Sequence, residues 1–238
     1  MEIRPVAHIY TDFPTKFGVP RQSGTATALK GTIVFENFYR DPEAVKGLDG
    51  FDYIWVLWDF SKAHRKDGEW AATACPPRLG GKTHMGIWAT RSPFRPNNIG
   101  LSSVRLDSIE FTEDRGPVLH VSGIDMMDGT PVYDIKPYIR YDCHPDARDG
   151  YVAETSRHSL KVEDPEGLIE SAGMLNAEQK RALWEVLSED PRPQFDADDS
   201  GQRRYGFYYG TGENGKALCD VRFTVCGNVL TVVEIVIQ

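Results

Sequence analysis

Apolar and polar positions alternate through the first 140 residues in a way that predicts a series of short strands. Residues 31–37 place Ile33 and Phe35 on one face and polar side chains on the other, as expected of a half-buried strand. Residues 52–58 form a continuous aromatic and β-branched run, which predicts a central strand buried on both faces. Further strands are expected at residues 3–10, 84–90, 99–111, 118–126 and 131–138.

Short connections join these strands. A short helix is expected at residues 41–47, capped by Asp41 and ended by Gly47. Asp128-Gly129 lies between two apolar runs and predicts a hairpin turn. Strands at this spacing, without a strand–helix–strand rhythm, favour a mainly β (α+β) protein with an antiparallel or mixed β-barrel core. The lack of a G-x-G-x-x-G motif after a strand argues against a Rossmann-type enzyme.

The pattern changes after residue 140. Residues 141–174 are acidic and weakly patterned, which predicts a poorly ordered linker. Asn176 begins a helix, with Gln179 in the reciprocal capping position, and the helix ends at Asp190. Strands follow at residues 207–209, 220–225 and 229–237, and Gly227-Asn228 predicts a two-residue hairpin turn before the last of them. The expected organisation is therefore a barrel (1–140), an acidic linker (141–174) and a small C-terminal α+β unit (175–238), packed on the barrel or on a second copy of the chain.

Composition describes a soluble globular protein of 238 residues with 40% apolar content. No apolar run reaches the 18 residues of a membrane span, and the N-terminus lacks the apolar core of a signal peptide. The four cysteines are scattered, which argues against a zinc site or a disulfide framework and fits the reducing cytoplasm. We therefore expect a cytoplasmic protein without a membrane anchor and without a metal.

The net charge of −8 is unevenly distributed. Residues 60–105 contain eight basic and two acidic residues, whereas residues 141–202 contain fifteen acidic and six basic ones. A local basic patch attracts RNA even when the whole chain is acidic. The alternative is that these charges are spread over the surface and cancel.

One loop, residues 91–102, combines features of a recognition segment. Pro93 and Pro96 fix φ and keep the preceding residues out of the helical region, so the loop is expected to be stiff and extended. Such a loop would hold Arg91, Arg95 and Asn97 outward, where guanidinium groups bind carboxylate or phosphate at two points. The alternative is a proline-stiffened connection with surface arginines.

Six motifs carry a resemblance to a known family. They are Phe17-Gly-Val-Pro-Arg-Gln22, Pro77-Arg-Leu-Gly-Gly81, residues 89–102, Asp128-Gly-Thr-Pro-Val132, Asp134-Ile-Lys-Pro-Tyr138 and Asp190-Pro-Arg-Pro193. Together, and in this order, they resemble the TrmO family, also called TsaA-like. The resemblance covers about residues 5–140 and resumes more faintly from residue 184.

This resemblance implies a homodimeric β-barrel methyltransferase that uses S-adenosylmethionine. The implied reaction methylates N6 of threonylcarbamoyladenosine, next to the anticodon of threonine-type tRNA. Carried over by motif, the donor site would consist of Pro20, Arg21, Gln22, Ser61, Lys62, Arg91, Leu101, Asp128, Gly129, Thr130 and Pro131.

Two positions depart from the family pattern. Ser61 stands where relatives often have histidine, which puts a side-chain contact there in doubt. Asn98 replaces the second proline of the usual Pro-Asn-Pro-Ile, so the loop is expected to be less stiff than in relatives.

The substrate carries an anionic threonyl carboxylate next to RNA phosphates. Candidates for reading these groups are Arg95, Asn97 and Arg192, the last within the motif that begins at Asp190. Tyr205, Phe207 and Tyr208 either stack on a base or belong to the small sheet, and Trp55, Trp58 and Trp88 are assigned to core packing.

The catalytic residue is left open. N6 must lose a proton, and Asp128, Asp134 or His64 would serve as general base unless positioning alone suffices.

Two other functions compete with tRNA methylation. One is a non-catalytic S-adenosylmethionine sensor, favoured by the net negative charge. The other is a small-molecule methyltransferase, which the basic run disfavours.

Overall fold

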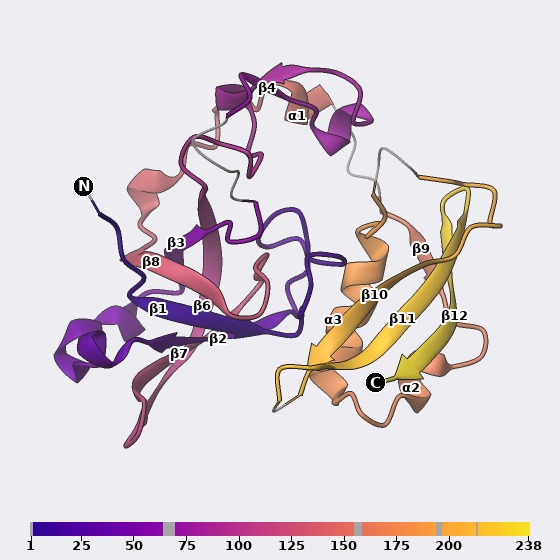
Figure 1. The fold of residues 1–238 in the computed structure, drawn as a ribbon. Helices are drawn as coiled ribbons and strands as arrows, with labels where there is room; N and C mark the ends of the chain where they lie inside the picture. Colours follow the sequence, from indigo (N-terminus) through magenta and orange to yellow (C-terminus); the bar gives the residue numbers. More distant parts are fainter. Residues whose placement is uncertain (1, 64–69, 155–158, 194–196, 213) are drawn as a thin grey trace.

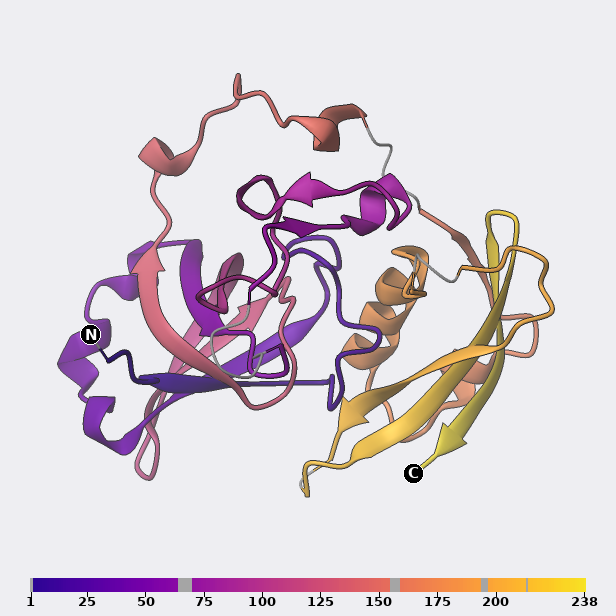
Figure 2. The same ribbon diagram turned by 45° about the horizontal axis from the view of Figure 1, so that its top comes forward.

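Two units lie side by side in the computed structural model, a β-barrel and a smaller sheet with one long helix (Figure 1). The structure describes residues 2–63, 70–154, 159–193, 197–212 and 214–238. Helix α3 (Ala177–Ser188) lies between the smaller sheet and the barrel in Figures 1 and 2. In the described part of the chain, no helix is long and apolar enough to cross a membrane.

The barrel confirms the expected mainly β architecture. Its six strands close in the order β1-β2-β7-β6-β3-β8, and every neighbouring pair is antiparallel. The strands are β1 (Ala7–Thr11), β2 (Lys30–Phe35), β3 (Tyr53–Asp59), β6 (Ile99–Thr112), β7 (Gly116–Ser122) and β8 (Thr130–Pro137). Closure leaves no free sheet edge in this unit.

Strand β3 is central, with β6 and β8 as its neighbours, but only one of its faces is buried. Ile54, Val56 and Trp58 point into the barrel, while the alternate side chains are only partly buried and Tyr53 is exposed. The expectation of burial on both faces was wrong because a barrel has one interior. The outward-facing aromatic side chains of this strand instead pack on the residue that follows β8, as Trp55 does on Tyr138.

Asp128-Gly129 forms a turn but not a hairpin. Strands β7 and β8, which it connects, are not neighbours, because β8 pairs with β1 and β3. The N–H of Thr130 donates to the carbonyl of Met127, and Gly129 has a φ of +69° that favours glycine. The local turn signal was correct, but the pairing of the flanking strands was set by barrel closure.

The remaining connections of the barrel are short. The helix expected at residues 41–47 is a 3₁₀ turn at Pro42–Val45, capped by the Asp41 side chain. The strand expected at residues 84–90 is reduced to β5 (Met85–Gly86), which pairs with β4 (Thr73–Ala74). The other 3₁₀ turns are Asn37–Tyr39, Leu48–Gly50, Pro77–Leu79, Ile87–Ala89 and Arg140–Asp142.

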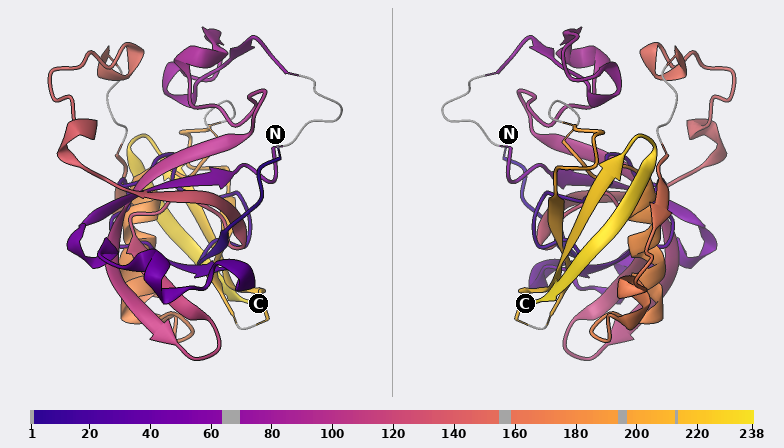
Figure 3. Two further views of the ribbon diagram at one scale, coloured as in Figure 1. Left: turned by 90° about the vertical axis from the view of Figure 1, so that its left-hand side faces the viewer. Right: turned by 90° about the vertical axis from the view of Figure 1, so that its right-hand side faces the viewer.

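The C-terminal unit is a four-stranded sheet in the order β10-β11-β12-β9 (Figure 3). Asn176 and Gln179 form the expected capping box at the start of α3. Residues 227–228 form the expected two-residue turn between β11 and β12. Its other elements are β9 (Lys161–Glu163), α2 (Leu168–Ser171), β10 (Tyr205–Thr211), β11 (Ala217–Cys226) and β12 (Val229–Ile237), and the short helix α1 (Tyr151–Glu154) precedes this unit in the chain.

Residues 160–174 belong to this unit and are not a linker. Strand β9 pairs with β12 in parallel, and Leu160 and Ile169 are buried in the core. The expectation of a poorly ordered segment was wrong here because a few apolar side chains, spaced among acidic ones, suffice to anchor it. The apolar contacts outweigh the cost of ordering a short segment.

The C-terminal unit packs directly on the barrel. Phe13, which follows β1, contacts Tyr209 edge-to-face with ring centroids 5.5 Å apart. The Asp12 carboxylate accepts a hydrogen bond of 2.7 Å from Gln179 of α3, and the Asp12 carbonyl accepts one from the Gly210 N–H. Gly18 has no room for a side chain, because a Cβ there would lie 2.5 Å from the Phe207 ring. The two units therefore share one apolar interface.

Candidate functional site

The residues implied by the resemblance collect at one end of the barrel. Strands β1, β3 and β7 end there, and β2, β6 and β8 begin there, because neighbouring strands are antiparallel. The three connections at this end are residues 12–29, 60–98 and 123–129, and we call it the loop end. The described part of the second connection, residues 70–98, forms a separate lobe beside the barrel (Figures 1 and 2).

Arg91 and Gln22 meet at the loop end although 69 residues separate them. The Arg91 Nη1 donates a hydrogen bond of 2.6 Å to the Gln22 side-chain oxygen, and Gln22 in turn donates to the Arg21 carbonyl. The Arg91 side chain is exposed. A charged, exposed guanidinium held by a neutral amide remains able to bind a carboxylate.

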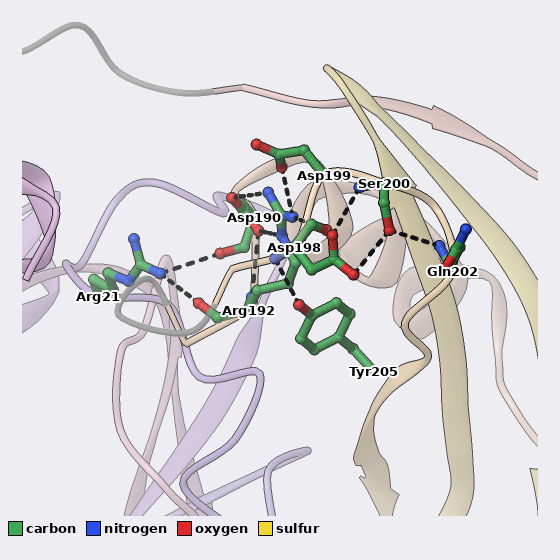
Figure 4. A network of polar contacts seen from close by, with 8 residues as sticks. All are labelled: Arg21, Asp190, Arg192, Asp198, Asp199, Ser200, Gln202 and Tyr205. Carbon is green, nitrogen blue, oxygen red and sulfur yellow. Dashed lines mark hydrogen bonds and ion pairs between the residues drawn. The ribbon is translucent and has the colours of Figure 1, made fainter.

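Arg21 serves a different purpose from Arg91. Its Nη2 donates to the carbonyl oxygens of Asp190 and Arg192, at 3.3 and 2.8 Å. These bonds connect the Pro20–Gln22 segment to the C-terminal unit (Figure 4). Arg91 is therefore better placed than Arg21 to bind a ligand carboxylate.

Arg95 does not point outward. Its Nη1 donates to the carbonyls of Ile87 and Thr90, and its guanidinium lies 5.4 Å from the Trp88 ring centroid. Asn98 likewise donates a 2.6 Å hydrogen bond to the Pro93 carbonyl. The loop is therefore braced from inside by the side chains of Arg95 and Asn98. Asn97 is exposed, as expected.

Asp128 holds the turn that leads into β8. Its Oδ1 accepts a 2.9 Å hydrogen bond from the Thr11 N–H, and its own N–H donates to the Phe13 carbonyl. Burial raises the pKa of Asp128, and the backbone hydrogen bonds oppose this shift. Gly129 is exposed, whereas Thr130 is buried inside the barrel, and Pro131 stands opposite His8 of β1.

Three other implied donor residues, Ser61, Lys62 and Leu101, are on the surface of the same end, whereas Pro20 is buried. Ser61 and Lys62 are exposed and lie in a turn in which the Ala63 N–H donates to the Phe60 carbonyl. Leu101, the third residue of β6, is 53% exposed. This exposed leucine lies beside basic loops and offers apolar surface that a ligand or a partner would cover.

Asp125 is a functional candidate that the sequence patterns did not single out. The Ser102 hydroxyl donates a 2.6 Å hydrogen bond to its Oδ1, and the Trp58 indole N–H donates to Ser102 at 2.9 Å. Burial raises the pKa of Asp125 to about 6, although Ser102, the Ser23 N–H and the Arg91 charge lower it. A lone charged residue in the run predicted as a strand at 118–126 was the available signal.

Trp88 does not belong to the core, contrary to its assignment from the sequence. It is 69% exposed, and Trp70, itself 49% exposed, stacks against it with ring centroids 6.0 Å apart and an interplanar angle of 28°. Arg95 lies over the same indole. We call Trp70, Trp88 and Arg95 the aromatic platform. The lobe that carries it is too small to enclose two indoles.

Arg192 is buried in the structure. Its Nε and Nη2 donate to the two carboxylate oxygens of Asp190 at 2.7 and 2.9 Å, and its Nη1 donates to Asp199 (Figure 4). The side chains of Arg192 and Asp190 are each 4% exposed. Burial lowers the pKa of Arg192, but the carboxylates outweigh it and raise the pKa above its ordinary value. The pair therefore holds a fold element together and does not present a surface for RNA.

The other candidates are dispersed. Asp134 lies on β8 in an ion pair of 2.7 Å with Lys136 and is half-exposed, and His64 lies outside the described residues. Phe207 and Tyr205 pack with the core of the small sheet, and Tyr208 is exposed. Among the residues that the structure describes, no cluster of histidine, cysteine, aspartate or glutamate has the arrangement of a metal site.

Comparison with known proteins gives a consistent result. Residues 8–143 match the family model of the tRNA-methyltransferase O N-terminal domain. The tRNA (adenine(37)-N6)-methyltransferase of Escherichia coli is 33% identical over 211 residues, which cover 87% of this chain and 88% of the relative. A protein of Pseudomonas aeruginosa described as a putative S-adenosylmethionine-dependent methyltransferase, RcsF, is 37% identical over 209 residues, covering 86% and 87%.

Solved structures agree in fold over the whole chain. A crystal structure of TrmO from Pseudomonas aeruginosa superposes with a TM-score of 0.74 at 29% identity, covering 99% of this chain and 98% of that one. The family match spans the barrel and its loop end, and the structural match includes the C-terminal unit. The chain therefore belongs to the tRNA-methyltransferase O (TrmO) family.

Proposed function

We propose that this protein is an S-adenosylmethionine-dependent tRNA methyltransferase acting on N6 of threonylcarbamoyladenosine next to the anticodon. The observation that carries the proposal is the gathering of the three loop-end connections, which brings Gln22, Arg91 and the Asp128–Thr130 turn to one end of the barrel. Relatives named as tRNA (adenine(37)-N6)-methyltransferases support the same reaction. We propose the cytoplasm, where tRNA is modified, as its location.

The loop-end residues fit the chemistry of the methyl donor. When bound, S-adenosylmethionine supplies a methyl group on a positively charged sulfur. Arg91 would bind its carboxylate, and Leu101 would offer apolar surface to its adenine. Gly24 and Gly129 have φ values of +75° and +69° with open space at the Cβ position, so the backbone there allows close approach.

The protein's contribution to the reaction is mainly positioning. Methyl transfer is an in-line displacement, so the acceptor nitrogen must be held opposite the leaving sulfur. Arg91 is held by Gln22, and Gln22 belongs to the segment that Arg21 anchors to the C-terminal unit. This chain of contacts would keep the donor in a fixed orientation while the RNA approaches from the exposed side.

The aromatic platform and its basic neighbours favour RNA over a small acceptor. Unpaired RNA bases stack on exposed indole rings and on guanidinium planes. Arg78 and Lys82 lie in the same lobe, and Arg78 is close enough to Arg21 to affect its pKa. We propose that this lobe contacts the anticodon loop of a threonine-type tRNA, with Asn97 and Arg95 beside it.

A homodimer is also proposed, as the family resemblance implies. Sedimentation of the purified chain would measure it. A species of about twice 26.7 kDa would support the dimer, and a single 26.7 kDa species across micromolar concentrations would contradict it.

The deciding experiment is transfer of labelled methyl from S-adenosylmethionine to total tRNA. The tRNA comes from cells that lack this protein, and tRNA that lacks threonylcarbamoyladenosine is the control. Label in the first sample alone would establish the enzyme and its acceptor. Donor binding by calorimetry without label in either sample would overturn the tRNA reaction and favour the sensor or the small-molecule enzyme.

A further inference from the structure

A short hydrogen-bonded relay runs from the barrel interior to the loop end. The Trp58 indole, 7% exposed, donates to the Ser102 hydroxyl, and Ser102, 1% exposed, donates to the Asp125 Oδ1. Trp58 itself is fixed, because it occupies the space over Gly100, where a Cβ would lie 2.3 Å from its ring. The relay therefore holds Ser102 with its proton directed at Asp125 and leaves the carboxyl little freedom to rotate.

Asp125 lies between two segments already placed in the donor site. The Gly24 N–H donates to the Gly123 carbonyl at 2.8 Å, which brings the segment after Gln22 against the segment that carries Asp125, and the Arg91 charge lowers the pKa of Asp125. From β6 comes only the neutral Ser102 hydroxyl. In the described structure this carboxyl has no ion pair, so its partners are two neutral donors and one exposed guanidinium at longer range.

We propose that Asp125 is the general base that takes the proton from the acceptor N6 during methyl transfer. This inference rests on the proposed function and deepens it. The N6 lone pair forms the new bond to the methyl carbon as the carbon–sulfur bond breaks, and the sulfur keeps that electron pair. The N6 proton passes to the Asp125 carboxylate and leaves later to water, so charge and protons balance.

Asp128 and Asp134, the two carboxylates that the sequence offered for this role, fit it less well. The Asp128 Oδ1 already accepts a hydrogen bond from the Thr11 N–H, and this contact holds the turn before β8. Asp134 is ion-paired with Lys136 and also accepts from the Ile135 N–H. Asp125 has a pKa of about 6, so it is mostly ionised at neutral pH and remains basic enough to accept a proton.

The test compares Asp125→Asn with Asp134→Asn as a matched control. Asparagine keeps the shape of the side chain and can still accept from Ser102. We expect Asp125→Asn to slow methyl transfer in a single turnover by roughly 100-fold or more, within the usual range for a lost general base. Donor affinity by calorimetry should stay close to the wild-type value, and the melting temperature at neutral pH should not fall, because the substitution removes a buried charge. Asp134→Asn should retain wild-type transfer.

The pH profile provides a second, independent readout. For the wild type, kcat/KM for the donor should rise with pH along a limb centred near 6. Ser102→Ala removes a hydrogen bond that lowers the Asp125 pKa, so it should move this limb to higher pH. A residue with a purely structural role would not produce such a shift.

Three outcomes would overturn the proposal. One is Asp125→Asn with wild-type transfer and an unchanged pH limb. Another is a large loss of donor affinity in that variant, which would make Asp125 a ligand of the donor ammonium instead. The third is unfolding of Asp125→Asn together with an unmoved limb in Ser102→Ala. If the wild type itself transfers no methyl while binding the donor, the proposed function fails first, and the two failures are thus distinguishable.

Discussion

Two segments of this chain place an arginine between prolines, but the fold gives the two arginines different environments. Residues 93–96 read Pro-Phe-Arg-Pro and residues 190–193 read Asp-Pro-Arg-Pro. Arg95 donates to two carbonyl oxygens and lies beside an exposed indole at the loop end. Arg192 is 4% exposed and bound at two points by the Asp190 carboxylate.

The difference lies in what covers each guanidinium. Around Arg192, the Asp198–Ser200 segment and Tyr205 close over the ion pair, so the charge is buried and compensated (Figure 4). Around Arg95, the described hydrogen bonds go to neutral carbonyls, so no carboxylate among these partners compensates its positive charge. Similar local sequence therefore produces a buried ion pair in one region and a partly exposed guanidinium beside an exposed indole in the other.

The largest expected effect breaks the clamp. Arg192→Ala should lower the free energy of unfolding by about 3–5 kcal/mol, because Asp190 would be left buried without its partner. Arg222→Ala is the matched control, since its pairs with Asp220 and Glu234 are half-exposed and screened by solvent, so its loss should cost much less stability. Urea denaturation measures both, and equal losses would contradict the contrast.

The same contrast holds for two carboxylates. Neutral groups donate hydrogen bonds to Asp125, whereas a guanidinium donates to Asp190. The folded-state pKa of Asp125, about 6, lies above its ordinary value of 3.8, so the folded protein binds more protons between these values. Stability should consequently fall by at most about 3 kcal/mol as pH rises from about 4 to 6. Asp125→Asn should remove this part of the slope in thermal melts. An unchanged slope would show that the carboxyl is not desolvated.

A smaller effect tests the loop end as a ligand site. Arg91→Ala should weaken donor binding by about 30-fold, or about 2 kcal/mol, because a charged hydrogen-bond partner of the donor is removed. Its stability should stay within about 0.5 kcal/mol of the wild type, since the side chain is exposed. Calorimetry with S-adenosylmethionine measures the affinity. Arg115→Ala, in the turn at the opposite end of the barrel, should change neither quantity.

The smallest effect concerns the aromatic platform. Trp88→Ala should weaken tRNA binding by about 10-fold, since stacking contributes about 1–3 kcal/mol per base. Phe111→Ala is the control, because Phe111 is also exposed but lies near the far end of β6. Filter binding at fixed salt measures both affinities. A dimer that dissociates in Trp88→Ala, with RNA affinity intact, would instead identify the platform as an interface between copies.

Much of the fold was determined locally by the sequence. Alternating residues predicted the barrel strands near their observed bounds, and the capping box at Asn176 and the turn at Gly227-Asn228 lie where expected. These features depend on neighbours within a few residues, which is why a single chain reveals them. The resemblance also predicted which loops would form one donor site, and the structure brings these loops to one end of the barrel.

Only the tertiary structure decided which polar groups are exposed and which are buried. Closure of the barrel separated β7 from β8 and brought Ser102 against Asp125, while packing of the C-terminal unit covered Arg192 and left Trp88 outside. Burial and the partners of a charge depend on segments far apart in the chain, such as residues 21 and 192. Local sequence patterns do not predict these contacts, because the contacts form only when the strands close into a barrel and the two units pack.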